Sequence, residues 1–106
     1  MNGASGKPTD RHYGRFQTLN HFVDFTMSKL SRAEVAVWMI LFRDTKKDGT
    51  ARVAQADMAR RAGADDRTMR RALRRLIGLR LVSVVRQGGL GRGPSTYRVN
   101  TNPPSW

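Results

Sequence analysis

Arginine is the residue type that could do chemistry in this chain. Five arginines fall within nine positions of the segment DDRTMRRALRRL, namely Arg67, Arg70, Arg71, Arg74 and Arg75. The guanidinium group is a planar fork of donors that suits bidentate contact with phosphate oxygens and with guanine. Like charges four residues apart destabilise an isolated helix by roughly 0.2–0.5 kcal/mol per pair. The segment therefore indicates an anionic partner or a compensating feature of the fold.

A helical wheel puts all five arginines on one side of this segment. At about 100° per residue, Met69, Leu73 and Leu76 cluster on one arc and the arginines share the opposite arc. Asp65 can cap the helix, and Asp66 lies in its first turn, where the helix dipole favours acid. A merely solvated face is the competing interpretation. Such faces usually mix both signs of charge, so an anion-binding face is favoured.

The overall charge agrees with this interpretation. The chain has 20 Lys and Arg against 8 Asp and Glu, and 16 of the 20 basic residues are arginine. Between positions 60 and 98 there are eleven basic and two acidic residues. A GC-rich genome would also raise the ratio of arginine to lysine. The net charge of +12 favours nucleic acid, an acidic membrane surface or an acidic protein as the partner.

Several classes of function are disfavoured by what the sequence lacks. There is no cysteine, and His12 and His21 are too few for a zinc site, so no metal site is expected. The chain has one glutamate and no Ser-His-Asp arrangement, so we expect no catalytic residues. Nothing in the sequence suggests a cofactor or a small-molecule ligand. The longest apolar stretch, residues 35–42, is too short to span a bilayer. With no visible signal peptide, we expect a cytoplasmic protein without membrane contact.

The length of 106 residues predicts one domain with a modest core. Residues 1–15 lack periodicity and carry Gly, Pro and charge, so we expect a disordered arm there. Residues 16–100 form the domain, and residues 101–106, with two prolines, form an irregular tail. Apolar residues between positions 19 and 27 have roughly helical spacing and predict an extra N-terminal helix.

The most apolar segment follows Ser31. Ser31 and Glu34 have the S-x-x-E spacing of a capping box, which predicts a helix that starts at Arg32. Glu34 is the only polar residue in positions 33–42, and a helix that is apolar on all sides is normally buried on all sides. It therefore needs a second cover, either residues 16–27 of the same chain or another subunit. We favour the first.

The rest of the domain reads as a short strand, two helices and two strands: residues 50–53, 55–62, 66–78, 81–87 and 95–100. Gly63 separates the two helices, and GGLGRGP connects the last two strands. Helical spacing and strand alternation assign Trp38, Met58, Met69 and Tyr97 to the core. The expected fold class is mainly α with a small β-hairpin.

Together the two segments QADMARRAGADDRTMRRALRRL and LVSVVRQGGLGRGPSTYRV resemble a winged helix-turn-helix DNA-binding domain. The glycine at position 63, the capping Asp65 and the pattern R-T-[apolar]-R-R-A-[apolar] carry the resemblance. A wing tip of Gly, Arg and Pro and a Tyr-Arg-Val strand follow. The resemblance covers about residues 31–100. Bacterial transcription regulators and N-terminal domains of phage and plasmid replication proteins share this pattern.

Two positions depart from the family pattern. Relatives often have Ser or Thr at the position of Ala54, where it would cap the first motif helix. They often have Gly before the wing strand, where this chain has Arg80. Either Arg80 adopts a left-handed conformation at some energetic cost, or the turn shifts to Gly78.

The resemblance implies roles for particular residues. Helix 66–78 would enter the major groove, where Arg67 and Arg71, with Arg70 beside them, would read bases. Arg74 and Arg75 would contact phosphate, and Arg92 would lie in or over the minor groove. Two residues have open assignments: Thr68 contacts phosphate or supports the helix start, and Gln55 is a candidate phosphate contact.

The function expected from these residues is binding of double-stranded DNA, by a sequence-specific transcription regulator that acts through site occupancy. The alternative is a plasmid, phage or mobile-element protein that acts in replication initiation or recombination. RNA binding and protein contact are less favoured, because the aromatic residues fall mostly in the core and the arginine face is one-signed. A homodimer through residues 16–30 and the helix after Ser31 is an open alternative to a monomer.

Overall fold

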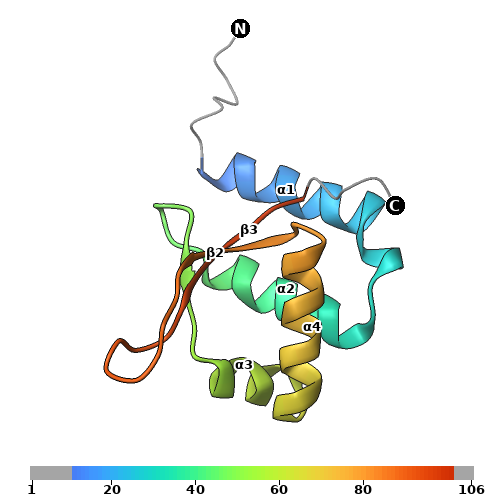
Figure 1. Cartoon of the computed structure of the whole chain (residues 1–106). Helices are drawn as coiled ribbons and strands as arrows, with labels where there is room; N and C mark the ends of the chain where they lie inside the picture. Colours follow the sequence, from blue (N-terminus) through green and yellow to red (C-terminus); the bar gives the residue numbers. More distant parts are fainter. Residues whose placement is uncertain (1–10, 102–106) are drawn as a thin grey trace, which may run out of the picture.

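The computed structural model describes residues 11–101 (Figure 1). Its elements are α1 (Arg11–Phe25), the short 3-10 helix η1 (Met27–Lys29), α2 (Arg32–Asp44), β1 (Ala51–Arg52), α3 (Gln55–Ala62), α4 (Asp66–Gly78), β2 (Val82–Arg86) and β3 (Thr96–Val99). The strands form an antiparallel sheet in the order β1-β3-β2. The expected fold class, mainly helical with a β-hairpin wing, is confirmed. The two helices and the three strands expected between positions 50 and 100 all form at the predicted places.

The central helix α2 begins where the capping box predicts. The Ser31 Oγ accepts from the Glu34 backbone N–H at 3.2 Å, and the Ser31 N–H donates to Glu34 Oε1 at 2.9 Å. These two bonds satisfy N–H groups that have no partner within the helix. The expected start at Arg32 is therefore confirmed.

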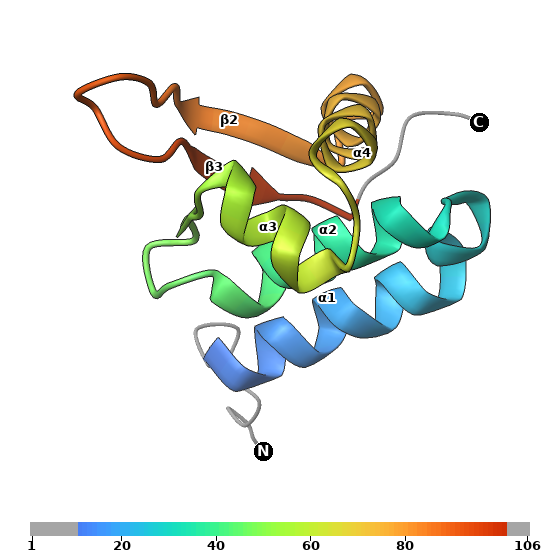
Figure 2. The ribbon, with the colours of Figure 1, turned by 90° about the horizontal axis from the view of Figure 1, so that it is seen from below.

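The first helix, α1, provides the second cover that α2 requires. Figure 2 shows α1 running alongside α2 on the side away from α4. Phe22 stacks on Trp38 with ring centroids 3.8 Å apart and an interplanar angle of 4°. Both side chains are fully buried, and Leu19 packs against the same cluster. The favoured interpretation, cover by residues of the same chain, is confirmed.

The N-terminal boundary was predicted wrongly. Helix α1 begins at Arg11, so residues 11–15 are helical and do not belong to an irregular arm. The Arg15 guanidinium lies 4.5 Å from the centre of the Phe42 ring and donates to the Phe42 carbonyl oxygen at 3.2 Å. This contact with the last turn of α2 stabilises a polar segment that has no helical periodicity of its own. Residues 1–10 and 102–106 lie outside the described residues.

The core forms where α2, α3, α4 and the sheet meet. The four residues assigned to it from the sequence are buried: Trp38, Met58, Met69 and Tyr97. The Trp38 indole N–H donates to the Asn100 carbonyl oxygen at 3.1 Å, which fastens the end of β3 to α2. These contacts fix the hairpin and α4 on the same scaffold.

The two departures from the family pattern have different outcomes. Arg80 has a φ of 63°, so the left-handed alternative is confirmed, while Gly78 remains in α4. Helix α3 begins at Gln55 without a side-chain cap from Ala54, whose backbone is nevertheless extended as a cap requires. Both positions keep the backbone conformation expected for the family pattern. Glycine at position 80 and Ser or Thr at position 54 would lower the energetic cost of these conformations.

Candidate nucleic-acid interface

The turn between α3 and α4 sets the direction of the arginine-rich helix. Gly63 ends α3 with a φ of 67°, and the Ala64 N–H donates back to the Ala59 carbonyl oxygen at 3.0 Å. Glycine reaches such a left-handed φ with little strain. The chain then reverses within two residues and enters the cap of α4.

Asp65 caps α4 by a hydrogen bond to the backbone of Thr68. Thr68 is also a candidate phosphate contact according to the resemblance. Asp65 Oδ1 accepts from the Thr68 backbone N–H at 2.7 Å, and this bond holds the pKa of the Asp65 carboxyl below its usual range. The backbone of Thr68 thus supports the helix start. Contact between the Thr68 hydroxyl and phosphate stays a prediction.

Helix α4 is amphipathic, with the buried and exposed faces that the helical wheel predicted. Met69, Ala72, Leu73 and Leu76 are buried against α2 and α3. All five arginines of the helix are exposed on the outer side: Arg67, Arg70, Arg71, Arg74 and Arg75. The hydrophobic residues therefore fix which face of α4 is offered to a partner.

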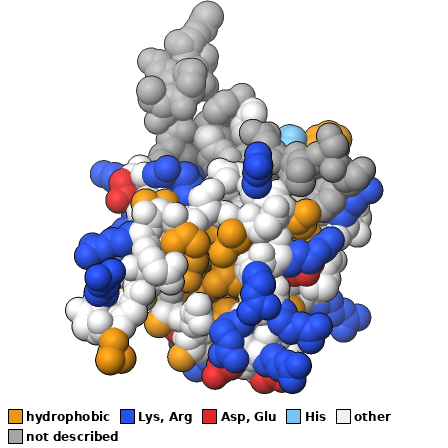
Figure 3. All heavy atoms as spheres, viewed as in Figure 1, with side chains coloured by type: hydrophobic (Ala, Val, Ile, Leu, Met, Phe, Trp, Pro, Cys, Tyr) orange, Lys and Arg blue, Asp and Glu red, His pale blue; other side chains and the backbone are white. Residues whose placement is uncertain are grey.

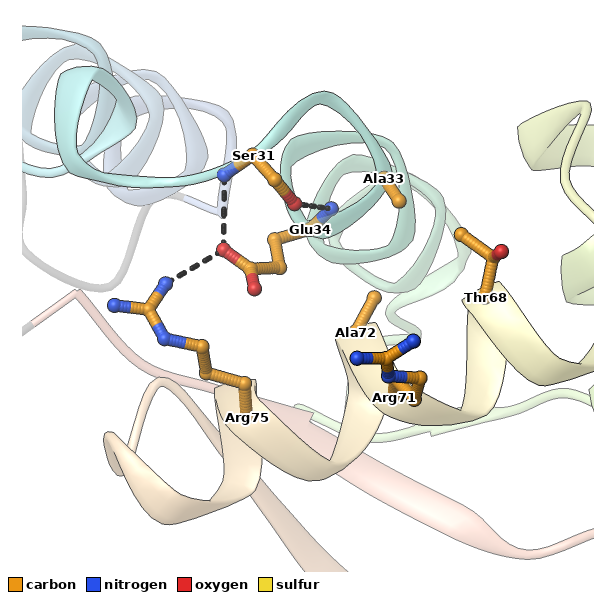
Figure 4. Close-up of a pocket in the computed structure, with 7 residues that line it drawn as sticks. All are labelled: Ser31, Ala33, Glu34, Thr68, Arg71, Ala72 and Arg75. Atoms are coloured by element: carbon orange, nitrogen blue, oxygen red, sulfur yellow. Dashed lines mark hydrogen bonds and ion pairs between the residues drawn. The ribbon is translucent and has the colours of Figure 1, made fainter.

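The exposed side of α4 has two flanks. Arg70 and Arg74 line a shallow groove together with Gln55 at the start of α3. Arg71 and Arg75, with Thr68, line a second groove beside the start of α2 (Figure 4). The structure thus separates Arg70 from Arg71, which line different grooves. The resemblance groups both with Arg67 as base-reading residues, because all three are near the start of the helix.

Arg75 makes an ion pair within the fold. Its Nη1 lies 2.7 Å from Glu34 Oε1, the same oxygen that accepts the Ser31 N–H (Figure 4). The Glu34 side chain is 10% exposed, whereas that of Arg75 is 48% exposed. The pair fastens α4 to the start of α2. Sequence reasoning recognised Glu34 as part of a cap, but nothing local indicated its second partner 41 positions away. A phosphate contact by Arg75 stays a prediction.

Two other arginines are also held by acids. Arg61 Nη1 and Nη2 lie 3.2 Å and 2.5 Å from the two carboxylate oxygens of Asp44, and Nη2 lies 3.1 Å from Asp57. The hydrogen bond from Arg61 is the main cause of the lowered pKa of Asp44. Arg60 pairs with Asp57. Part of the positive charge between positions 60 and 98 is thus neutralised inside the fold.

The remaining arginines of α4 have no such partner. Within residues 11–101, none of Arg67, Arg70, Arg71 and Arg74 makes a salt bridge. Guanidinium groups that are exposed and unpaired keep their donors available for an incoming anion. These four side chains are the strongest candidates for contact with a polyanion.

The wing consists of β2, β3 and the loop between them, and Arg92 is exposed at its tip. Hydrogen bonds within the loop hold the tip in a turn. The Gly89 N–H donates to the Gly93 carbonyl oxygen at 3.0 Å, and the Arg92 N–H donates to the Gly89 carbonyl oxygen at 2.9 Å. Gly93 has a φ of 76°, a left-handed conformation that favours glycine, and a Cβ at Gly88 would lie 2.3 Å from the Gly93 carbonyl oxygen. The wing is therefore a defined turn whose backbone favours glycine at these two positions.

The wing and α4 border the same face of the molecule. Figure 3 shows Lys and Arg side chains over α4 and beside the wing, with hydrophobic side chains between them. The structure therefore brings the arginines of α4 and the wing to one side, although Arg92 lies at the tip and apart from the two grooves. This arrangement offers two separate cationic regions to a large partner.

Other kinds of site have little support in the part of the chain that the structure describes. Residues 11–101 contain no group of three His, Cys, Asp or Glu side chains that could hold a metal ion. Their helices are too short or too polar to cross a bilayer. A scan against protein-family models gives no match, and searches of curated proteins and of solved structures give none either.

Proposed function

We propose that this protein binds double-stranded DNA with α4 in the major groove and the β2-β3 wing over the adjacent minor groove. The observation that carries the proposal is the set of four exposed arginines on α4 that make no salt bridge within the described residues. An exposed one-signed helix face is destabilised by like-charge repulsion. A chain of phosphates relieves that repulsion and releases counterions.

Within this proposal the residues divide by the contact that each can make. Arg67, Arg70 and Arg71 read guanine edges near the start of α4, Arg70 from the flank opposite Arg71. Arg74 and Gln55 line one groove and contact phosphate together. Arg92 at the wing tip contacts the minor groove. The proposed role is sequence-specific transcription regulation by site occupancy, in the cytoplasm of a prokaryote or on phage or plasmid DNA.

Selection of bound sequences from a random duplex pool tests the proposal most directly. We expect enrichment of a guanine-containing motif. Arg67→Ala and Arg71→Ala should each lower affinity for the selected duplex by roughly 5- to 150-fold, the equivalent of about 1–3 kcal/mol, and relax base preference. Arg60→Ala is the matched control, because it removes the same charge from an arginine that pairs with Asp57. Unchanged affinity of the double variant Arg67→Ala/Arg71→Ala would contradict the proposal.

The dependence of binding on salt is a second test. Each phosphate contact should contribute about 0.9 to the slope of log affinity against log salt, so several contacts give a steep fall. A flat dependence argues against DNA binding by this face. The form of the selected site then separates the two roles: a palindrome favours a two-fold regulator, and tandem direct repeats favour replication initiation. Enrichment in an RNA pool but not a duplex pool would favour RNA binding.

A further inference from the structure

Helix α1 has a second apolar surface that nothing within residues 11–101 covers. Its inner side, with Leu19 and Phe22, packs on α2. Phe16 and Val23 remain 64% and 46% exposed, and Asn20 lies exposed between them. Large apolar side chains at this exposure on a regular helix are typical of an interaction surface. We call Phe16, Asn20 and Val23 the outer stripe.

The outer stripe has the spacing of a helix-pairing seam. Its members are four and then three residues apart, the d-a-d pattern of a heptad. On the helical wheel the stripe is centred about 100° from the inner side, so α1 can pack on α2 and on another helix at the same time. Met27 follows four positions after Val23, at the start of η1, and is 37% exposed.

Charge identifies which occupant fits this surface. Residues 14–28 contain one basic and one acidic residue, Arg15 and Asp24, whereas the whole chain carries +12. The Arg15 guanidinium is turned inward onto Phe42. Two copies of a strongly cationic protein repel each other over most surfaces. The middle of α1 carries little of that like charge, since Arg11 and Lys29 lie at or beyond its ends.

We propose that α1 pairs with the α1 of a second copy, antiparallel, across a two-fold axis between Leu19 and Asn20. In an isologous contact, if residue i touches residue j, then j also touches i. The outer stripe meets this condition, because Phe16 of one copy faces Val23 of the other on both sides of the axis. The two Asn20 amides meet at the axis, where each supplies both a donor and an acceptor. A polar residue at such a position selects register.

Pairing through α1 goes beyond DNA binding and does not depend on it. A two-fold pair would present two α4 helices, which matches a palindromic site, but the pairing itself involves no DNA contact residue. The tests therefore use the protein alone, so that their failure leaves the proposed function untouched.

Sedimentation equilibrium of the full chain gives the first test. We expect a mass of twice 11.9 kDa. Phe16→Gln should raise the dimer dissociation constant by at least about tenfold, because a buried aromatic is lost on both sides of the axis. Phe25→Gln is the matched control: Phe25 is 63% exposed but lies about 90° beyond the inner side, away from the stripe. Circular dichroism melts establish that both variants fold, and Val23→Gln repeats the test. A monomer at the highest attainable concentration, or equal effects of the Phe16 and Phe25 variants, would overturn the proposal.

Cysteine cross-linking tests the antiparallel arrangement, because the chain has no cysteine of its own. Asn20→Cys at the axis should form a disulfide-linked dimer under mild oxidation. Phe16→Cys should not, since the two copies of position 16 would lie about 10 Å apart along antiparallel helices, beyond disulfide reach. Phe25→Cys is the control for random collision. Efficient linking through Phe16→Cys, or none through Asn20→Cys, would overturn the arrangement.

Discussion

The ion pair between Glu34 and Arg75 should contribute measurably to the stability of the fold. Two substitutions isolate it. Glu34→Gln removes the charge but keeps an acceptor for the Ser31 N–H, since glutamine also serves in a capping box. Arg75→Met keeps the aliphatic stem and the helix propensity of the arginine. The double variant completes a thermodynamic cycle.

The magnitude follows from burial and distance. Exposed ion pairs contribute about 0.2–1 kcal/mol, and breaking a buried pair costs about 3–5 kcal/mol. Here Glu34 is 10% exposed, Arg75 is 48% exposed, and their atoms lie 2.7 Å apart. The half-exposed guanidinium can rehydrate when its partner is lost, which keeps the effect near the lower range. We expect a coupling free energy of about 1 kcal/mol.

Urea unfolding of the four proteins measures this coupling. The matched control is Arg74→Met, which removes an exposed arginine that has no salt bridge within the described residues and should change stability by less than about 0.5 kcal/mol. Under the proposed function the two arginine variants should also differ in DNA binding. Arg74→Met should weaken DNA affinity more, and Arg75→Met should destabilise the fold more. Additivity of the single effects within about 0.3 kcal/mol would refute the reasoning.

Three further predictions concern single positions. Ala54→Ser should stabilise the protein by about 1 kcal/mol, because Ala54 has cap geometry without a cap hydrogen bond, and a rise in melting temperature checks this. Arg80→Gly should stabilise it by about 0.5–1 kcal/mol in urea unfolding, since glycine removes the left-handed strain but adds freedom to the unfolded chain. A loss of stability in either variant contradicts the corresponding argument. Arg61 lowers the pKa of Asp44, so the stabilisation by Asp44 is present above the unfolded pKa of about 4 and is lost as pH falls through the lower folded value. Asp44→Asn should therefore flatten the fall in unfolding free energy below pH about 4, and an unchanged slope in urea titrations at several pH values contradicts this.

The sequence predicted most accurately those features that depend on neighbours within one or two turns. The capping box at Ser31, the end of α3 at Gly63 and the cap at Asp65 all formed as expected. Hydrogen bonds across three or four residues, or one left-handed glycine, are sufficient to produce them. The outward placement of the α4 arginines also followed from local spacing.

The first helix was the least predictable element. A polar segment with Gly14 has little helix propensity, and Phe16 and Leu19 alone do not define a long apolar stripe. The contact of Arg15 with the last turn of α2 holds this part of α1 against the fold. It joins residues 27 positions apart, so no window along the sequence contains both partners.

By itself, then, the sequence determined a one-domain helical protein with a hairpin and a helix whose outer face is positively charged. Only the tertiary structure decided which of its arginines remain available. It paired Arg75 with Glu34 and Arg61 with Asp44, and it left the other four arginines of α4 without a salt bridge in the described chain. The physical reason is that helical periodicity fixes the face of a side chain, whereas ion pairing depends on what packing brings within about 4 Å.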